Sequence, residues 1–156
     1  MLPQGHLILG IILVAGLLLV FPSIGVLGAS IILASSVLID VDHYLYYIYK
    51  TKKLNPIKAY YWFRGNALKC KNLPKEKRCK VHFGTYILHG VEVLIILFTL
   101  GFFVSNIFYF ILVGFTFHLI VDLSTEIIKD NEFNKISIIY YFFKSKGLVF
   151  IDDLEE

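Results

Sequence analysis

The chain has 156 residues, of which 57% are hydrophobic, 16% aromatic and only 17% charged. Its mean hydropathy is +0.71, whereas soluble domains contain about 45–50% apolar residues and about 25% charged ones. These values argue against a soluble protein. Together with the length they predict a single membrane domain, residues 1–156.

Apolar segments follow one another along the chain in two pairs. The apolar runs are 7–21, 24–39, 86–104 and 107–123, with short turns at Pro22-Ser23 and Ser105-Asn106 inside the pairs, and they predict helices over residues 6–21, 24–43, 86–104 and 107–128. Backbone groups in lipid must be hydrogen-bonded within their own segment, so each segment is predicted to be a helix. The expected fold is all-α, an integral membrane four-helix bundle. Small residues of the first pair, such as Gly10, Gly16 and Gly28, either allow close helix packing or reflect the usual glycine content of membrane helices.

Cations are concentrated in the middle of the chain. Eleven of the fifteen Lys and Arg residues lie between Lys50 and Lys80, interleaved with aromatic residues. Tyrosine and tryptophan favour the headgroup level of a membrane, and clustered lysines attract anionic lipid. We therefore expect interfacial helices in the basic segment 44–85 and an interfacial tail at 129–156. Similar composition occurs on nucleic-acid surfaces, but the expected partners here are the lipid bilayer and its anionic headgroups, with no nucleic acid.

The two turns predict where each helix ends. Residue 6, residues 40–43, residues 89–92 and residues 118–122 should all reach the same side of the membrane. The basic segment lies on that side as well, and loops rich in Lys and Arg are cytoplasmic. The sequence thus predicts a multi-pass protein of the cell (inner or plasma) membrane, with both termini on the cytoplasmic side.

Acidic and imidazole side chains collect at these helix ends. They are His6, Asp40, Asp42, His43, His89, Glu92, His118 and Asp122. Ionisable residues in membrane segments are by default candidates for a functional site. Pairs spaced three or four residues apart share a helical face; they are Asp40 with His43, His89 with Glu92, and His118 with Asp122. Carboxylate and imidazole donors suit zinc first, with manganese or iron as alternatives, and the set suffices for one or two divalent ions.

Each of these groups also has an ordinary structural explanation. A lone histidine such as His6 is often interfacial, acids such as Asp40 can cap a following segment, and His118 can pair with Asp122 in a buried hydrogen bond. Explaining all of them in this way requires four independent coincidences at one membrane face. A metal centre is therefore the preferred interpretation, with ligands His6, Asp40, His43, His89, His118 and Asp122.

Three motifs mark the helix ends: Gly5-His6-Leu7, Leu38-Ile-Asp-Val-Asp-His43 and Gly114-Phe-Thr-Phe-His-Leu-Ile-Val-Asp-Leu123. They resemble the YdjM-like family of membrane-bound metal-dependent hydrolases, which has a LexA-regulated bacterial member and is distantly similar to zinc-dependent phospholipase C. The resemblance implies that the acids and histidines of these motifs form the metal site. The chain departs from the family pattern at Ile39, where the family has proline. It also lacks the family's Arg-Gly-x-Thr-His-Ser string, which is replaced by the sequence from His82 to Glu92.

These observations predict a membrane-bound metal-dependent hydrolase that cleaves a phosphoester, in a lipid or a lipid-linked phosphate, at the cytoplasmic face through a metal-activated water. Asp42 or Glu92 would accept the proton, and Arg64 or Lys69 would bind substrate phosphate. The alternative is a non-catalytic membrane protein with a structural metal or a buried hydrogen-bond cluster. An ion pathway is disfavoured because the polar groups lie at one end of the helices only.

Overall fold

The computed structural model describes residues 3–74, 77, 81, 82, 84, 86–130, 137–145 and 147–151. The chain forms two compact units, each built from two stretches of sequence. The first unit comprises Met1–Asp40 and Leu88–Ser137, and the second comprises Val41–Ile87 and Ile138–Glu156. The prediction that the whole chain acts as one domain stays a prediction.

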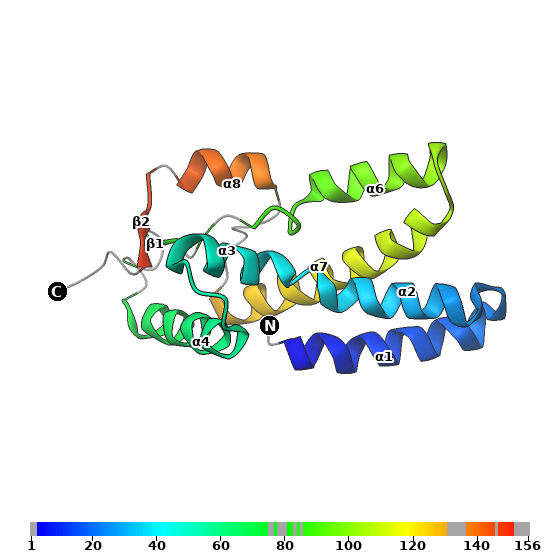
Figure 1. Ribbon diagram of the computed structural model, residues 1–156, viewed down its shortest axis with the longest axis horizontal. Coiled ribbons are helices and arrows are strands. Elements are labelled where there is room, and N and C mark those ends of the chain that lie inside the picture. Colours follow the sequence, from blue (N-terminus) through cyan, green and yellow to red (C-terminus); the bar gives the residue numbers. More distant parts are fainter. Residues whose placement is uncertain are drawn as a thin grey trace. The chain divides into compact units, whose positions relative to one another are not determined.

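Long apolar helices build the first unit (Figure 1). They are α1 (Pro3–Val20), α2 (Gly25–Leu38), α6 (Val91–Phe103) and α7 (Ile107–Asp130), with a short 3-10 turn, η1 (Pro22–Ile24), between α1 and α2. Helix α2 packs against both α1 and α7, and α6 packs against α7. Gly25 reverses the chain between α1 and α2 with φ +64°, a conformation that glycine adopts without strain.

The first and last helices of the first unit lie close to the predicted ranges, whereas the middle two have different bounds. Helix α7 begins at the predicted Ile107, and α1 begins three residues before the predicted His6. Helix α2 ends at Leu38, followed by a turn at Ile39 and Asp40, so the predicted helix 24–43 is two helices. The third helix begins at Val91 instead of residue 86, because Gly90 is extended (φ −112°, ψ 152°) and caps it.

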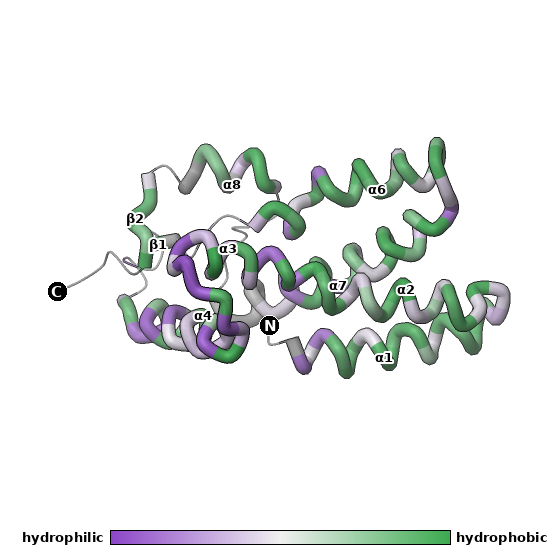
Figure 2. Tube along the Cα trace, in the orientation of Figure 1, coloured by the Kyte–Doolittle hydropathy of each residue, from purple (hydrophilic) through white to green (hydrophobic). Residues whose placement is uncertain are grey.

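Apolar side chains cover the outer surface of the first-unit helices. The helices α1, α2, α6 and α7 are hydrophobic along most of their length (Figure 2). Large residues such as Leu19, Val26 and Phe103 are 84%, 81% and 77% exposed. By length and composition two helical stretches, Pro22–Thr51 and Ile107–Thr125, could cross a membrane. The other two first-unit helices are apolar but shorter.

The second unit combines amphipathic helices with a small strand pair. Its elements are α3 (Val41–Thr51), α4 (Pro56–Asn72), β1 (Val81–His82), α8 (Ile138–Ser145) and β2 (Val149–Phe150). The strands β1 and β2 are parallel, with Val81 opposite Val149. The Asn55 side chain caps α4 by accepting hydrogen bonds from the amides of Ile57 and Lys58, as expected of an N-cap residue.

Aromatic residues of the basic segment pack against the core of the second unit. Val81, Phe150 and Ile151 are buried, and Tyr46 and Trp62 pack against them. The Trp62 and Phe150 rings stack with their centroids 6.3 Å apart. Some of the aromatic residues that the sequence assigned to a membrane interface are therefore core residues. Helices α3 and α4 cover much of the basic segment, and their interfacial location stays a prediction.

Candidate metal centre

His118 lies in α7 where this helix is pressed against α2. Gly114, one helical turn earlier, has no side chain, and a Cβ atom there would come within 2.5 Å of the Ile32 carbonyl oxygen in α2. This close approach lets the Nδ1 of His118 bond to the Ser36 carbonyl oxygen at 2.8 Å. Because a carbonyl only accepts hydrogen bonds, Nδ1 must carry the proton. In a neutral ring, Nε2 then presents a bare lone pair to the site.

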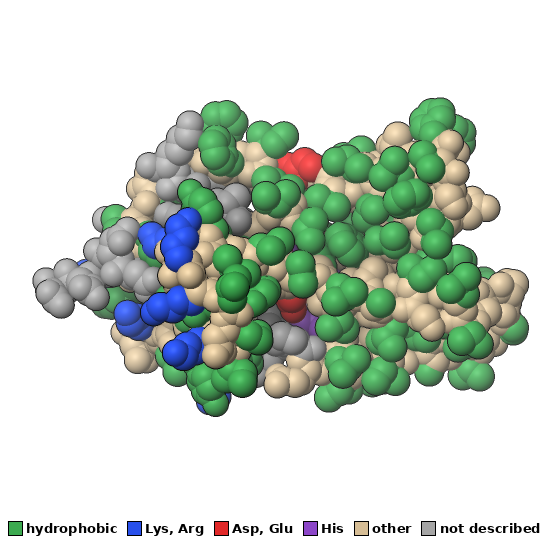
Figure 3. Space-filling view, in the orientation of Figure 1, with side chains coloured by type: hydrophobic (Ala, Val, Ile, Leu, Met, Phe, Trp, Pro, Cys, Tyr) green, Lys and Arg blue, Asp and Glu red, His purple; other side chains and the backbone are tan. Residues whose placement is uncertain are grey.

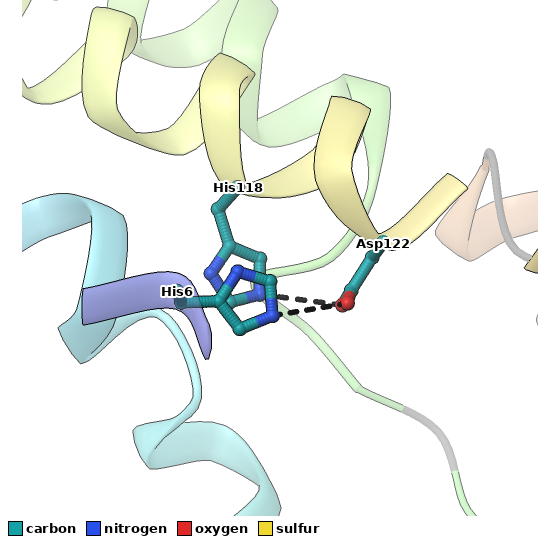
Figure 4. A group of neighbouring side chains, drawn as sticks. All are labelled: His6, His118 and Asp122. Carbon is teal, nitrogen blue, oxygen red and sulfur yellow. Dashed lines mark hydrogen bonds and ion pairs between the residues drawn. The ribbon is translucent and has the colours of Figure 1, made fainter. Parts of the chain in front are cut away.

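His6, near the start of α1, lies face to face with His118 (Figure 4). The ring centroids are 3.8 Å apart and the planes differ by 14°. The Nε2 of His6 is 3.1 Å from Oδ1 of Asp122, a hydrogen-bond distance. Both histidines are at most 1% exposed, and the Nδ1 of His6 has no hydrogen-bond partner within the described residues.

Asp40 and His89 complete the cluster from outside the helices. Asp40 occupies the turn after α2, and His89 occupies the bend before α6. The Nε2 of His89 is 3.5 Å from Oδ1 of Asp40 and 3.9 Å from Oδ2 of Asp122. The Nε2 of His118 is 3.5 Å and 3.3 Å from the same two oxygens. Two carboxylates and two imidazoles thus form a closed ring of alternating oxygen and nitrogen atoms, and His6 adjoins it.

Two carboxylate groups lie close together in this cluster. Oδ1 of Asp40 and Oδ2 of Asp122 both lie within 3.5 Å of one nitrogen, so they are at most about 7 Å apart. At an effective dielectric constant of 20 their repulsion is then roughly 2 kcal/mol or more. The lone pair of His118 Nε2 also faces these two acceptor oxygens. Positive charge in the ring, either as protons on the imidazoles or as a cation, would relieve this repulsion.

Three of the distances in the ring match the spacing of ligands around a divalent metal ion. Ligands held at about 2.0–2.2 Å around a tetrahedral zinc ion are roughly 3.3–3.6 Å from one another. Three of the four nitrogen–oxygen distances in the ring, 3.3, 3.5 and 3.5 Å, fall in this range, and all exceed the usual 2.7–3.2 Å of a hydrogen bond. His6, His118 and Asp122 also form a compact group of candidate ligand atoms by themselves. The buried His and Asp side chains could therefore hold a metal ion.

The other two residues of the acidic motif belong to the second unit. Asp42 is buried in the first turn of α3, and its Oδ1 accepts a hydrogen bond from Nδ1 of His43 at 2.8 Å. The His43 ring stacks on Tyr86 with the centroids 3.8 Å apart. Asp40 itself lies in the turn just before α3. The roles of His43 as a ligand and of Asp42 as a base stay predictions.

Glu92 lies in the first turn of α6 and its carboxylate accepts a hydrogen bond of 2.5 Å from the Ser137 hydroxyl. The prediction that His89 and Glu92 share a helical face is wrong, since His89 lies before the helix begins. By contrast, His118 and Asp122 do share a face of α7, as their spacing predicts. The role of Glu92 as a proton acceptor stays a prediction.

The proposed phosphate ligands Arg64 and Lys69 are exposed on α4, in the second unit. Their predicted role in binding substrate is untested. Gly114 belongs to the motif that contains His118 and Asp122, but its role in bringing α7 close to α2 was not predicted from the sequence, nor was the contribution of the Ser36 carbonyl. A backbone carbonyl such as that of Ser36 leaves no signal in the sequence.

Comparison with known proteins adds no family assignment: no protein-family model, no curated protein and no solved structure matches this chain.

Proposed function

We propose that this chain is a membrane-bound metal-dependent hydrolase of the YdjM-like kind, acting on a phosphoester of a lipid or a lipid-linked phosphate. The observation that carries the proposal is the convergence of His6, His89 and His118 with Asp40 and Asp122 in the first unit. Neutral imidazoles and carboxylates are the donors that zinc, manganese and iron accept. A purely structural role rarely accounts for so many ionisable groups among apolar helices.

The apolar helices support a membrane location for this chemistry. An aqueous protein rarely exposes large contiguous apolar patches, yet hydrophobic side chains cover the visible surface of α1, α2 and α6 (Figure 3). We propose that these helices and α7 form a four-helix membrane bundle. The absence of Lys and Arg from residues 1–49 and 81–128, against eleven between 50 and 80, favours a cytoplasmic site under the positive-inside rule.

The residues of the centre would have different roles, as metal ligands, as a group that orients a ligand, and as a proton acceptor. Asp40, His89, His118 and Asp122 would hold the metal ion, with His6 as a further ligand or as a donor to Asp122. When bound, a divalent metal lowers the pKa of a coordinated water and polarises a phosphoryl oxygen. The Ser36 carbonyl holds His118 in the tautomer that presents Nε2; such partners fix ring orientation and ligand basicity. Asp42 or Glu92 would take up the proton.

One contact favours the non-catalytic alternative. The 3.1 Å distance between His6 and Asp122 is that of an ordinary hydrogen bond, and with protonated imidazoles the cluster could be a buried polar network. Such a network needs no metal, whereas the hydrolase does. The two functions therefore differ in a measurable property of the purified protein.

The deciding experiment is to measure the metal content of the full chain purified in detergent without chelator. We expect close to one or two zinc, manganese or iron ions per chain, and near-complete loss in Asp40→Ala and His118→Ala. The metal-loaded protein is then assayed on phospholipids, lipid phosphates and lipid-linked pyrophosphates, with Glu92→Gln expected to lower the rate without removing the metal.

Matched variants separate folding from binding in this assay. Ser124→Ala removes an exposed hydroxyl from the same helix as His118, so it should retain full metal. A protein that binds no metal while Asp40→Ala and His118→Ala fold normally would exclude a metal centre. If the protein binds metal but turns over no phosphoester, the metal has a structural role and the hydrolase proposal is wrong.

A further inference from the structure

Helix α4 has an apolar stripe on its outer face, away from the core of the second unit. Ala59 and Asn66, seven residues apart, are buried at 5% and 3% exposure. On the opposite side of the helix, Ile57, Tyr61 and Leu68 are 67%, 62% and 53% exposed. Their spacing of four and seven residues places them along a single line on the helix surface.

Cations border this stripe on both sides. With 100° of rotation per residue, Arg64 and Lys71 fall along one edge of the stripe and Lys58 and Lys69 along the other. All four are exposed, and α4 (Pro56–Asn72) contains no Asp or Glu. Blue side chains gather over α3 and α4 in Figure 3. The outer face of α4 is therefore an apolar line between two rows of positive charge.

We propose that this face of α4 is a binding surface for anionic phospholipid. In an interfacial helix the apolar line enters the boundary between headgroups and acyl chains, and the cations reach outward to the lipid phosphates. The pattern here has the expected order, with apolar residues central and long cationic side chains at both edges. This inference rests on the proposed membrane location of the chain but not on the metal centre or on catalysis.

Charge complementarity favours lipid over other occupants of this face. A nucleic acid would be bound by cations together with several aromatic rings on which successive bases stack. In the stripe Tyr61 stands beside the aliphatic Ile57 and Leu68, and the neighbouring Trp62 stacks on Phe150 in the core. A protein groove would cover the apolar stripe but would not require cations along both of its edges. A bilayer containing anionic headgroups satisfies both parts of the pattern at once.

The test is photo-crosslinking of the full chain reconstituted in bilayers. Tyr61 is replaced by p-benzoylphenylalanine, and the crosslinked mass is measured in phosphatidylcholine with and without phosphatidylglycerol. We expect lipid adducts, enriched in phosphatidylglycerol over its mole fraction. Arg64→Gln with Lys71→Gln should lower that enrichment by up to about fivefold per charge removed, and high salt should lower it too. The charge-preserving pair Arg64→Lys with Lys71→Arg should keep it.

A second photoreactive position distinguishes failure of this inference from failure of the membrane proposal. Leu19 in α1 is 84% exposed and is expected to crosslink to lipid whatever its headgroup. Adducts from position 19 but none from position 61 would overturn the α4 inference and leave the membrane bundle standing. Crosslinks from position 61 to protein, or lipid adducts without headgroup preference, would overturn it as well. No lipid adducts at either position would contradict the membrane location itself.

Discussion

Replacing Asp122 by asparagine is expected to abolish metal binding while leaving the metal-free fold intact. Asp122 approaches three histidines, at 3.1 Å for His6, 3.3 Å for His118 and 3.9 Å for His89. Asparagine has nearly the same shape but no negative charge. We expect metal affinity to fall by more than about 100-fold, because even partners outside the coordination sphere contribute 10–100-fold. Metal analysis and competition with a chelating dye measure this loss.

The stability of Asp122→Asn distinguishes a metal centre from a hydrogen-bond network. In a metal centre the bound ion stabilises the folded state, so chelator should lower the free energy of unfolding of the parent protein and leave that of Asp122→Asn unchanged. In a network of protonated histidines, removing a buried partner should cost about 3–5 kcal/mol. Unfolding in detergent with and without chelator measures both values. A large loss of stability that is independent of chelator would contradict the metal centre.

The convergence of the donors could be predicted in part from the sequence, because it depends on topology. Turns at Pro22-Ser23 and Ser105-Asn106 bring the ends of separate helices to one side, and His118 and Asp122 need only the four-residue helical repeat. These elements are found where the sequence places them. His6, Asp40 and His89 join the same cluster in the first unit, even though two of them lie outside helices.

The predictions failed where the choice of packing partner overrides hydrophobicity. The apolar run ends at Ile39 and the predicted helix extended it to His43, but α2 ends at Leu38 and the amphipathic α3 begins at Val41, in the other unit. Tyr86 was assigned to a membrane helix, yet it is buried and stacks on His43. Composition alone cannot distinguish an aromatic residue at a membrane surface from one in a small core, because both environments favour the same residue types.

Gly114→Ala is expected to damage both the helix packing and the metal centre. The new Cβ atom would come within 2.5 Å of the Ile32 carbonyl oxygen and 2.9 Å of the Ser36 amide nitrogen, in addition to its contact with the Ser35 hydroxyl. The hydroxyl can rotate away, but the backbone of α2 cannot, so α2 and α7 must separate. Overpacking of this kind costs about 1–3 kcal/mol. The separation also moves His118 from the Ser36 carbonyl, so metal affinity should fall by about 10–100-fold.

Two further variants attribute this effect to the backbone contact between α2 and α7. Gly16→Ala adds the same methyl group to α1, where nothing lies within 4 Å of the new atom. The metal content should therefore be unchanged, and the unfolding temperature should be unchanged or slightly higher because alanine favours a helix. Ser35→Ala combined with Gly114→Ala removes the hydroxyl contact and leaves the contact with Ile32. If the Ile32 carbonyl limits how closely the helices approach, this double variant should still unfold at a lower temperature than the parent protein and bind less metal. If the unfolding temperature and the metal content both recover fully, the Ser35 side chain is the group that obstructs the helices. The hydrogen bond from His118 to the Ser36 carbonyl would then be retained after the two helices repack.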